Sequence, residues 1–214
     1  MSARAFENVT TWVFDLDNTL YDPAVRLFDQ IEPRMTAWVM KVVGVDEAEA
    51  DMLRQDYWGR YGTTWAGLVA EHDMDLEAFL WDVHQIDFSG VSPVPGLGTA
   101  LDALPGRKVV FTNGTADYAR DVLDALEIKD VFNAIYGVHE AGLRPKPDPA
   151  AFEAVFAKDG LDPHAAAMFE DVPRNLEVPH AMGLRTVLVA PEHSGHPHIH
   201  HHTDDLPGFL NTLT

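Results

Sequence analysis

The sequence predicts an α/β fold, a Rossmann-like parallel sheet with helices on both faces, together with an inserted helical cap domain. Short apolar runs rich in β-branched and aromatic residues alternate with helix-like patterns along most of the chain. This alternation is typical of strand–helix units, which build a parallel sheet buried on both faces. One long segment has only helical periodicity, and a Pro/Gly-rich stretch follows it. A helical domain is therefore expected to interrupt the α/β pattern.

Five strands are predicted in the α/β part of the chain. In chain order they are Trp12–Phe14, Val109–Phe111, Ala134–Val138, Ala167–Phe169 and Thr186–Val189. Helices are predicted between the later strands at Ala116–Leu126, Pro149–Lys158 and Pro173–Met182. Because parallel strands are joined by right-handed crossovers, these helices are expected to cover the sheet.

Residues 21–91 form the predicted cap, inserted after the first strand and closing over the sheet. Apolar side chains recur at helical spacing across Phe28–Val42, and Pro33 is expected to kink this helix or to mark its start. Further helices are expected at Met52–Tyr61 and Leu76–Val83.

The return to α/β alternation is marked by the turn-forming segment Ser92–Gly96. The predicted domains are thus a Rossmann-like catalytic core of residues 1–20 and 92–214, and the helical cap of residues 21–91. The chain has 214 residues, of which 46% are hydrophobic, enough for a well-buried core.

Composition excludes several classes of function. The chain has 34 acidic and 15 basic residues, a formal net charge of −19, so nucleic acid polymers and anionic membranes are not expected partners. Without cysteine it has no disulfides, thiolate metal sites or cysteine nucleophile. The first residues lack the pattern of a signal peptide and no apolar run has membrane-spanning length, so we expect neither a signal peptide nor a membrane span. We expect a cytoplasmic protein, as a monomer or homodimer, acting on a small phosphorylated metabolite.

Polar side chains follow several predicted strands, where ligands bind in parallel α/β sheets. The candidates are Asp15, Asp17, Thr112, Asn113, Glu170 and Asp171, joined by Lys146 from a proline-rich loop. Four carboxylates cannot all stay ionised side by side without compensating charge. A lysine and a hard divalent cation such as Mg²⁺ would supply that charge and would allow a phosphate group to bind. Asp-x-Asp spacing also suits a two-step displacement: one carboxylate attacks phosphorus, and the other protonates the leaving oxygen and later activates water.

Each of these signals has an ordinary structural explanation when taken alone. An Asp-x-Asp or Thr-Asn-Gly sequence after a strand is often a turn, a lysine between prolines is usually solvated, and Glu170-Asp171 suits a helix N-terminus. Their joint occurrence, in order and each in its expected place, favours a shared site.

These motifs resemble the haloacid dehalogenase (HAD) superfamily of phosphohydrolases. Asp15–Thr19 matches its first motif, DxDx[TV], Thr112 the second, Lys146 the third and Glu170-Asp171 the acidic fourth. The resemblance covers almost the whole chain, since the helical insert falls where the family's C1-type cap enters.

Longer sequence segments around these motifs resemble the pyrimidine 5′-nucleotidase branch of this superfamily. They are Phe14–Tyr21, Arg144–Pro147, Phe169–Leu176 and, in the cap, Tyr61–Leu68. The resemblance implies a Mg²⁺-dependent phosphomonoesterase that releases phosphate from UMP or CMP through an aspartyl-phosphate.

The resemblance also implies roles for individual residues. Asp15 would be the nucleophile and a metal ligand, and Asp17 the general acid/base with its backbone carbonyl on the metal. Lys146 would neutralise nucleophile and phosphate, and Asp171 would complete the metal shell. Glu170 stands where many relatives have Asp, so its contact with the metal is left open.

Substrate binding is expected from a second group of residues. By resemblance, Thr112 and the backbone amide of Asn113 or Gly114 would hold the phosphoryl oxygens, and Asn175 would orient the metal shell. In the cap, Arg26, Tyr61 and His72 are candidate substrate contacts.

Two other features favour structural interpretations. The histidine-rich segment 193–202 is expected to be a solvated loop rather than a metal site. The cap residues Trp38, Trp58, Trp65 and Trp81 are expected to pack in its core rather than to stack on a base.

Alternatives to the nucleotidase hypothesis remain open at this stage. Dehalogenases lack an acid at the position of Asp17, so this residue favours phosphoryl chemistry. A phosphosugar phosphatase or phosphomutase on the same fold is the next hypothesis. An acidic Mg²⁺-binding interaction module is the non-enzymatic one. A phospho-acceptor receiver domain fits less well. In such domains the acceptor aspartate usually follows the third strand and there is no insert, whereas here the aspartate follows the first strand and a helical insert comes after it.

Overall fold

A six-stranded, wholly parallel sheet is the centre of one of two units into which the chain divides. The computed structural model describes residues 3–214. The sheet-containing unit, called the core unit below, comprises the chain up to Pro23 together with Val91–Thr214. The other unit, Ala24–Gly90, is helical and is called the cap unit.

The strand order places the site-bearing strands in the middle of the sheet. The strands are β1 (Thr11–Phe14), β2 (Arg107–Phe111), β3 (Ala134–Tyr136), β4 (Ala166–Glu170), β5 (Arg185–Val189) and β6 (His201–Thr203). Their order is β3-β2-β1-β4-β5-β6, and Val13 of β1 pairs with Val109 on one side and Met168 on the other. The predicted α/β fold with a parallel sheet is confirmed.

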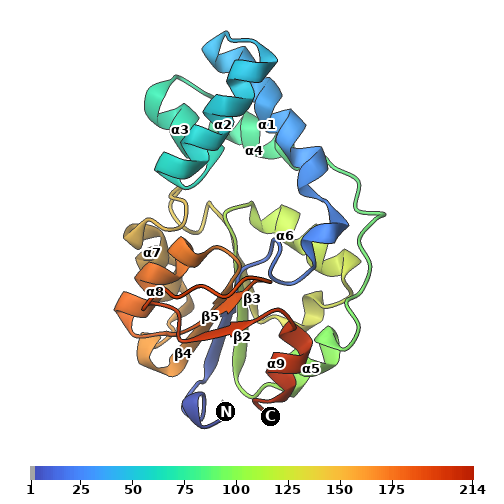
Figure 1. Cartoon of the computed structure of the whole chain (residues 1–214), viewed down its shortest axis with the longest axis vertical. Helices are drawn as coiled ribbons and strands as arrows, with labels where there is room; N and C mark the ends of the chain where they lie inside the picture. Colours follow the sequence, from blue (N-terminus) through green and yellow to red (C-terminus); the bar gives the residue numbers. More distant parts are fainter. Residues whose placement is uncertain (1–2) are drawn as a thin grey trace. The chain divides into compact units, whose positions relative to one another are not determined.

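Helices cover both faces of the sheet, as expected (Figure 1). The helices α7 (Pro149–Asp159) and α8 (Glu177–Met182) contact each other on one face. On the other face lie α5 (Leu97–Ala103), α6 (Ala116–Ala125) and α9 (Leu206–Asn211). Short 3₁₀ turns complete this unit, at Ala3–Ala5, Lys129–Val131, Pro163–Ala165 and Pro173–Leu176. The predicted helix Pro173–Met182 is therefore a 3₁₀ turn followed by α8.

The sixth strand corrects the interpretation of the histidine-rich segment. His201 and His202 belong to β6 and pair with Val187 and Leu188 of β5. Just before the strand, His200 Nδ1 lies 2.8 Å from Thr186 Oγ1. The expectation of a solvated loop is therefore wrong for the last residues of the segment, which form the edge of the sheet.

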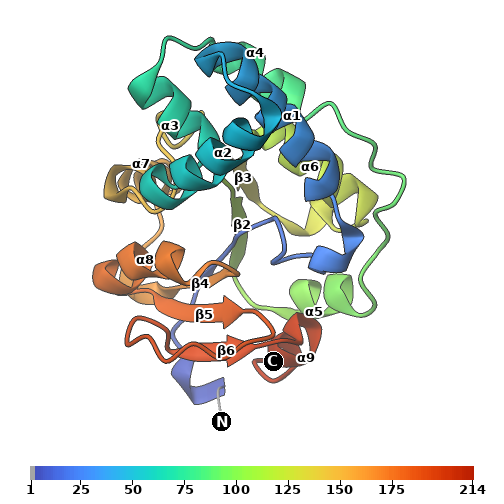
Figure 2. The same ribbon diagram turned by 45° about the horizontal axis from the view of Figure 1, so that its top comes forward.

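The cap unit contains four helices, and a 3₁₀ turn at the boundary with the core unit precedes them. The helices are α1 (Phe28–Val43), α2 (Glu47–Tyr61), α3 (Thr64–Glu71) and α4 (Leu76–Val83), with Pro23–Val25 as the 3₁₀ turn before them. Figure 2 shows the cap helices gathered together, and α2 contacts both α1 and α3. Pro33 lies inside α1, which begins five residues earlier, so it does not mark the start of the helix.

The cap tryptophans divide between interior and surface. Trp65 is 5% exposed and packs inside as expected, whereas Trp58 and Trp81 are 51% and 67% exposed. The expectation of core packing is therefore wrong for Trp58 and Trp81. Trp38 is half-buried, and its indole N–H donates to Asp82 Oδ2 at 2.9 Å.

Local sequence explains how the loops at the site begin and end. Thr115 caps α6 by accepting a hydrogen bond from the backbone N–H of Tyr118, and Asp148 caps α7 with Pro149 at its first position. A side chain at Gly137 would collide with the backbone of Gly114 and Ala116. Glycine there lets the β2–α6 loop approach the end of β3 closely.

No helix among residues 3–214 combines the length and the apolar character that crossing a membrane requires.

Candidate active site

The loop after β1 places a buried carboxylate at the carboxyl edge of the sheet. Asp15 is 5% exposed, and its backbone N–H donates to Phe169 O at 2.9 Å, which extends the pairing of β1 with β4. Thr19 Oγ1 donates to Asp15 Oδ2 at 3.2 Å. Between them, Asn18 has a φ of 60°, a left-handed conformation that asparagine tolerates well. The chain therefore turns back over Asp15 directly after the strand.

The ammonium group of Lys146 joins residues from three strand ends. Lys146 Nζ lies 2.6 Å from Asp15 Oδ1 and 2.7 Å from Glu170 Oε2, and it donates to the backbone oxygen of Phe111 at 3.0 Å. Its side chain is 1% exposed. All three ammonium protons thus have an acceptor, so the position of this charge is fixed by buried partners.

Asn113 holds the backbone of Lys146 in place. Asn113 Oδ1 accepts the backbone N–H of Lys146 at 2.7 Å, and Asn113 Nδ2 donates to Lys146 O at 3.4 Å. The side chain of Asn113 therefore links the β2 loop to the proline-rich loop, a role that sequence analysis did not predict for it.

The predicted phosphate cradle also lies at this edge. Thr112 is 1% exposed, its backbone N–H donates to Tyr136 O at 3.0 Å, and its Oγ1 accepts the N–H of Gly114 at 3.0 Å. The structure thus brings Thr112, Asn113 and Gly114 into one tight turn directly after β2.

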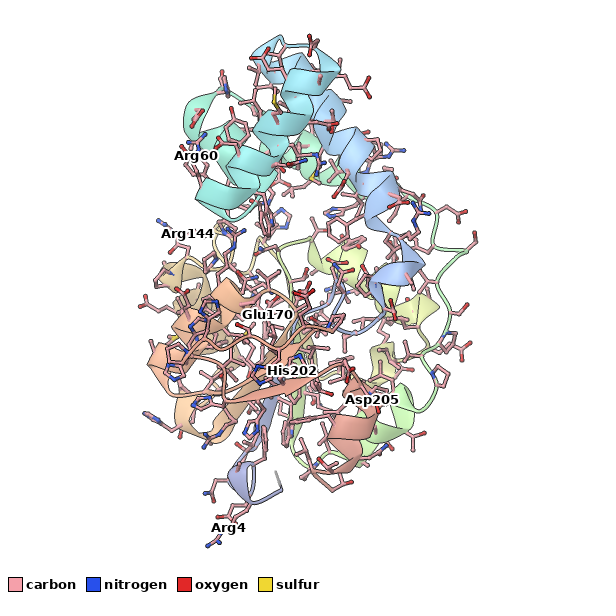
Figure 3. All side chains as sticks on the ribbon, viewed as in Figure 1. Arg4, Arg60, Arg144, Glu170, His202 and Asp205 are labelled. Carbon is pink, nitrogen blue, oxygen red and sulfur yellow. The ribbon has the colours of Figure 1, made fainter. Side chains whose placement is uncertain are left out.

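Three carboxylates at the ends of β1 and β4 form one cluster. Oxygens of Asp15, Glu170 and Asp171 all lie within 4.8 Å of one another, and Glu170 Oε1 accepts the N–H of Val172 at 3.2 Å. Figure 3 shows Glu170 at the end of β4. Asn175 is 6% exposed, and its Oδ1 is buried with no hydrogen-bond partner in the described part of the chain. A donor set of carboxylate and amide oxygens suits a hard cation such as Mg²⁺.

The electrostatics of the cluster show an excess of negative charge. Burial, and then the nearby charge of Glu170, raise the pKa of Asp15 to about 7 although Lys146 opposes them. The same two causes raise the pKa of Asp171 to about 10. Burial alone would lower the pKa of Lys146, but Asp15 and Glu170 raise it overall. One ammonium therefore does not balance the three carboxylates, and a bound cation would relieve their repulsion.

Asp17 is held by two tyrosines rather than by the carboxylate cluster. Tyr21 and Tyr118 both donate their hydroxyl protons to Asp17 Oδ1, at 2.6 and 2.7 Å. Burial raises the pKa of Asp17, and the two hydroxyl groups oppose this effect. Sequence analysis missed both tyrosines. Helical spacing from Asp17 could have indicated Tyr21, but no local signal connects Tyr118 with Asp17.

A model of one protein family matches residues 9–183, most of the chain, and it is described as that of haloacid dehalogenase-like hydrolases. The chain belongs to the haloacid dehalogenase-like hydrolases. This match confirms that the enzyme is a hydrolase, and the relatives named as phosphatases support the predicted HAD phosphatase type.

The similar proteins share less than a third of the aligned residues with this hydrolase. It is 30% identical over 188 residues to a phosphoglycolate phosphatase of Mesorhizobium japonicum, an alignment covering 83% of this chain and 81% of the relative. It is 27% identical over 192 residues to phosphate metabolism protein 8 of Saccharomyces cerevisiae. That alignment covers 82% of this chain but only 60% of the longer yeast protein.

A solved structure shows the same fold. The HAD-hydrolase YfnB of Bacillus subtilis, described as bound to magnesium and as revealing interdomain movement, superposes with a TM-score of 0.65 at 16% identity. The superposition covers 96% of this chain and 99% of YfnB.

The core unit of the hydrolase also contains a pocket beside the carboxylate cluster. It has a volume of about 540 Å³ and includes Asp171 in its lining, along with the segment from Asn18 to Pro23. Its lining also includes the segments after β5 and β6, with Pro191 and Asp204 among them. The Asp171 side of the cluster therefore borders an open space in the core unit.

The cap residues of the hydrolase that were candidate substrate contacts have partners within the cap unit. Tyr61 donates to Glu71 Oε1 at 2.8 Å, and His72 Nε2 lies 3.0 Å from the hydroxyl oxygen of Tyr57. Arg26 is 74% exposed and pairs with Asp29 at 2.5 Å. Their role in substrate binding stays a prediction.

Proposed function

We propose that this chain is a Mg²⁺-dependent phosphomonoesterase that works through an aspartyl-phosphate on Asp15. The observation that carries the proposal is the buried contact of Lys146 Nζ with both Asp15 Oδ1 and Glu170 Oε2. It places a fixed positive charge beside the carboxylate that would attack phosphorus. Such preorganised charge stabilises transferring phosphoryl groups.

The reaction would proceed in two balanced steps. Asp15 attacks phosphorus, the bond from phosphorus to the leaving oxygen breaks, and Asp17 gives that oxygen its proton. A water molecule then attacks the phosphorus of the aspartyl-phosphate, Asp17 takes the proton of the water, and the bond to Asp15 breaks. Thr112 would orient the phosphoryl oxygens. Mg²⁺, when held by Asp15, Asp171 and the backbone carbonyl of Asp17, would supply positive charge to the phosphoryl oxygens.

We propose a pyrimidine nucleoside 5′-monophosphate such as UMP or CMP as the substrate, because the phrases around Asp15, Lys146 and Glu170 resemble that branch. The cap unit Ala24–Gly90 would act as a C1-type cap that selects the leaving group. We also propose that the protein acts in the cytoplasm, a reducing compartment with which a sequence without cysteine is compatible.

A second candidate substrate is phosphoglycolate, because two relatives, 30% and 28% identical, are named as phosphatases for it. Specificity constants across UMP, CMP, phosphoglycolate and sugar phosphates separate these candidates, since kcat/KM measures discrimination between substrates. A preference for phosphoglycolate over UMP and CMP would replace the nucleotidase proposal.

Replacement of the nucleophile tests the proposal directly. Asp15→Asn should lower turnover of p-nitrophenyl phosphate by at least about 10⁴-fold, since a covalent route is lost. Acid-quenched wild-type protein should carry one phosphoryl group, found by mass spectrometry on the peptide containing Asp15, and the variant should carry none.

A matched control is Asp121→Asn, which removes an exposed carboxylate from α6 in the same unit. It should retain turnover within about twofold, as expected for a surface substitution. Phosphoenzyme on another residue, or full activity of Asp15→Asn, would remove Asp15 from the mechanism.

A further inference from the structure

The carboxylate of Asp17 is bound asymmetrically by two buried phenols. Tyr21 comes from the loop after β1, and Tyr118 lies in the first turn of α6, 101 positions away from Asp17. Each tyrosine is 3% exposed. Both hydroxyl protons are donated to the same oxygen, Oδ1, at 2.6 and 2.7 Å. The side chain of Asp17 is therefore held from two separate parts of the core unit.

This arrangement distinguishes the two oxygens of Asp17. A tyrosine hydroxyl has a single proton to donate, and Oδ1 is the oxygen within hydrogen-bond distance of both hydroxyls, which also interact with each other. A proton on Oδ1 would have to displace one of these donors, whereas a proton on Oδ2 would not. The hydrogen bonds therefore favour the protonated carboxyl group with its proton on Oδ2.

The position of α6 makes the contact between Tyr118 and Asp17 a rigid one. Thr115 fixes the first turn of the helix by accepting the N–H of Tyr118 at 3.2 Å. The preceding turn is fixed by the close approach of Gly137 to the backbone of Gly114. Phenylalanine at position 118 or 21 would keep the ring and its packing but would leave Oδ1 without that donor.

We propose that Tyr21 and Tyr118 are positioning residues that turn Asp17 so that Oδ2 delivers the proton to the leaving oxygen. This inference rests on the proposed phosphomonoesterase function. The two tyrosines would then favour cleavage of phosphate esters of aliphatic alcohols. The alkoxides of these alcohols are poor leaving groups and need a proton. As phosphorus bonds to Asp15 and the ester oxygen departs, the proton of Oδ2 moves to that oxygen. An aryl ester such as p-nitrophenyl phosphate needs this proton much less, because the ring stabilises the departing phenolate.

The test compares two esters in Tyr118→Phe, Tyr21→Phe and the double variant. The readout is kcat/KM, which reports the steps up to release of the leaving group. We expect kcat/KM for an aliphatic ester, UMP or the best aliphatic substrate of the panel, to fall about 10- to 100-fold in each single variant. The value for p-nitrophenyl phosphate should fall at most about threefold, since general acid catalysis contributes only where protonation is needed.

The control for removal of a buried phenol is Tyr136→Phe. Tyr136 is 7% exposed and donates to Asp159 Oδ1 at 2.8 Å, in the same kind of pair but away from Asp17. It should lower kcat/KM for both esters equally, by less than about twofold. Thermal unfolding of each variant confirms that folded protein is compared.

The outcomes distinguish failure of the positioning role of the tyrosines from failure of the phosphomonoesterase function. Equal losses on both esters in the tyrosine variants would show a merely structural role and overturn the inference. No loss on the aliphatic ester would overturn it as well. Either result leaves the phosphomonoesterase proposal intact, provided that the wild-type protein hydrolyses these esters. A wild-type protein that hydrolyses no phosphomonoester would overturn the proposed function and the inference together.

Discussion

Asn113 shows at the scale of single residues how one side chain can control the position of a charge. It holds the backbone of Lys146 through hydrogen bonds of 2.7 and 3.4 Å, and the ammonium of Lys146 in turn contacts Asp15. Asn133 makes a similar bond to another lysine, accepting the backbone N–H of Lys108 at 2.8 Å. The chain thus contains a matched pair of asparagines, one at the site and one outside it.

Replacing each asparagine should separate positioning from stability. Both Asn113→Ala and Asn133→Ala should lower the free energy of unfolding by about 1–3 kcal/mol, because a buried backbone N–H loses its acceptor. Only Asn113→Ala should also lower kcat, by at least about tenfold, since a small displacement of a charged group costs much of its effect. Urea unfolding and phosphatase assays measure the two quantities. Equal kcat values in both variants would contradict a positioning role for Asn113.

The residues that meet at the site were predicted to a large extent from their places after strands. Asp15, Thr112 and Asp171 follow parallel strands and Glu170 is the last residue of one, and parallel strands bring their carboxyl ends to one edge. Tyr118 could not be found in this way. Which side of the first turn of α6 points to Asp17 depends on the packing of that helix, and no pattern within the helix shows it.

At the scale of elements, the buried strands and the long helices were predicted well, and the elements that were missed are short ones. β1, β2, β4 and β5 are apolar and nearly fully buried, so their sequences carry a clear signal. β6 has three residues, two of them histidines, and it forms by pairing with β5 rather than through its own apolar pattern. The short helices α3 and α5 were not predicted either, whereas α4, which has eight residues like α3, was predicted as Leu76–Val83.

Helix α4 provides a prediction about pH. The helix is followed directly by His84, and burial lowers the pKa of this imidazole to about 4. Between this value and the ordinary pKa of about 6.5, the unfolded chain binds more protons than the folded one, so stability falls as the pH falls through this range. The cap unit should lose roughly 1–2 kcal/mol of unfolding free energy between pH 7 and pH 5 from this group.

Fluorescence can follow this loss, because Trp38, Trp58, Trp65 and Trp81 all lie in the cap unit. His84→Gln, which does not titrate, should show a correspondingly smaller loss in urea unfolding between the two pH values. If the wild type and the variant lose the same amount, His84 does not contribute to the pH dependence.

At the scale of the whole molecule, the net charge of −19 affects stability in two separable ways. Like charges over the surface repel each other, and salt screens this repulsion. Mg²⁺ should act beyond screening, because binding to the folded state at Asp15 and Asp171 adds stability in proportion to RT ln(1 + [L]/Kd). We expect MgCl₂ to raise Tm by a few degrees more than NaCl of equal ionic strength.

Asp171→Asn separates the binding of Mg²⁺ from the screening of charge by salt. The variant removes one carboxylate from a crowded buried cluster, so without metal its Tm should equal or exceed that of the wild type. The increase specific to MgCl₂ should disappear, while the increase with NaCl should remain. An undiminished response to MgCl₂ in differential scanning calorimetry would show that Asp171 does not hold the ion.

The chain leaves the core unit at Pro23 and returns at Val91, after Asp15, Asp17 and Tyr21 and before Thr112. Every hydrogen bond described around Asp15, Asp17 and Lys146 therefore joins partners within the core unit. Natural variation across the 67 residues from Ala24 to Gly90 can accumulate without disturbing those bonds. On the function proposed above, reactivity and selectivity would be encoded in separate stretches of one gene, so descendants of this protein could acquire new metabolites while inheriting the same chemistry.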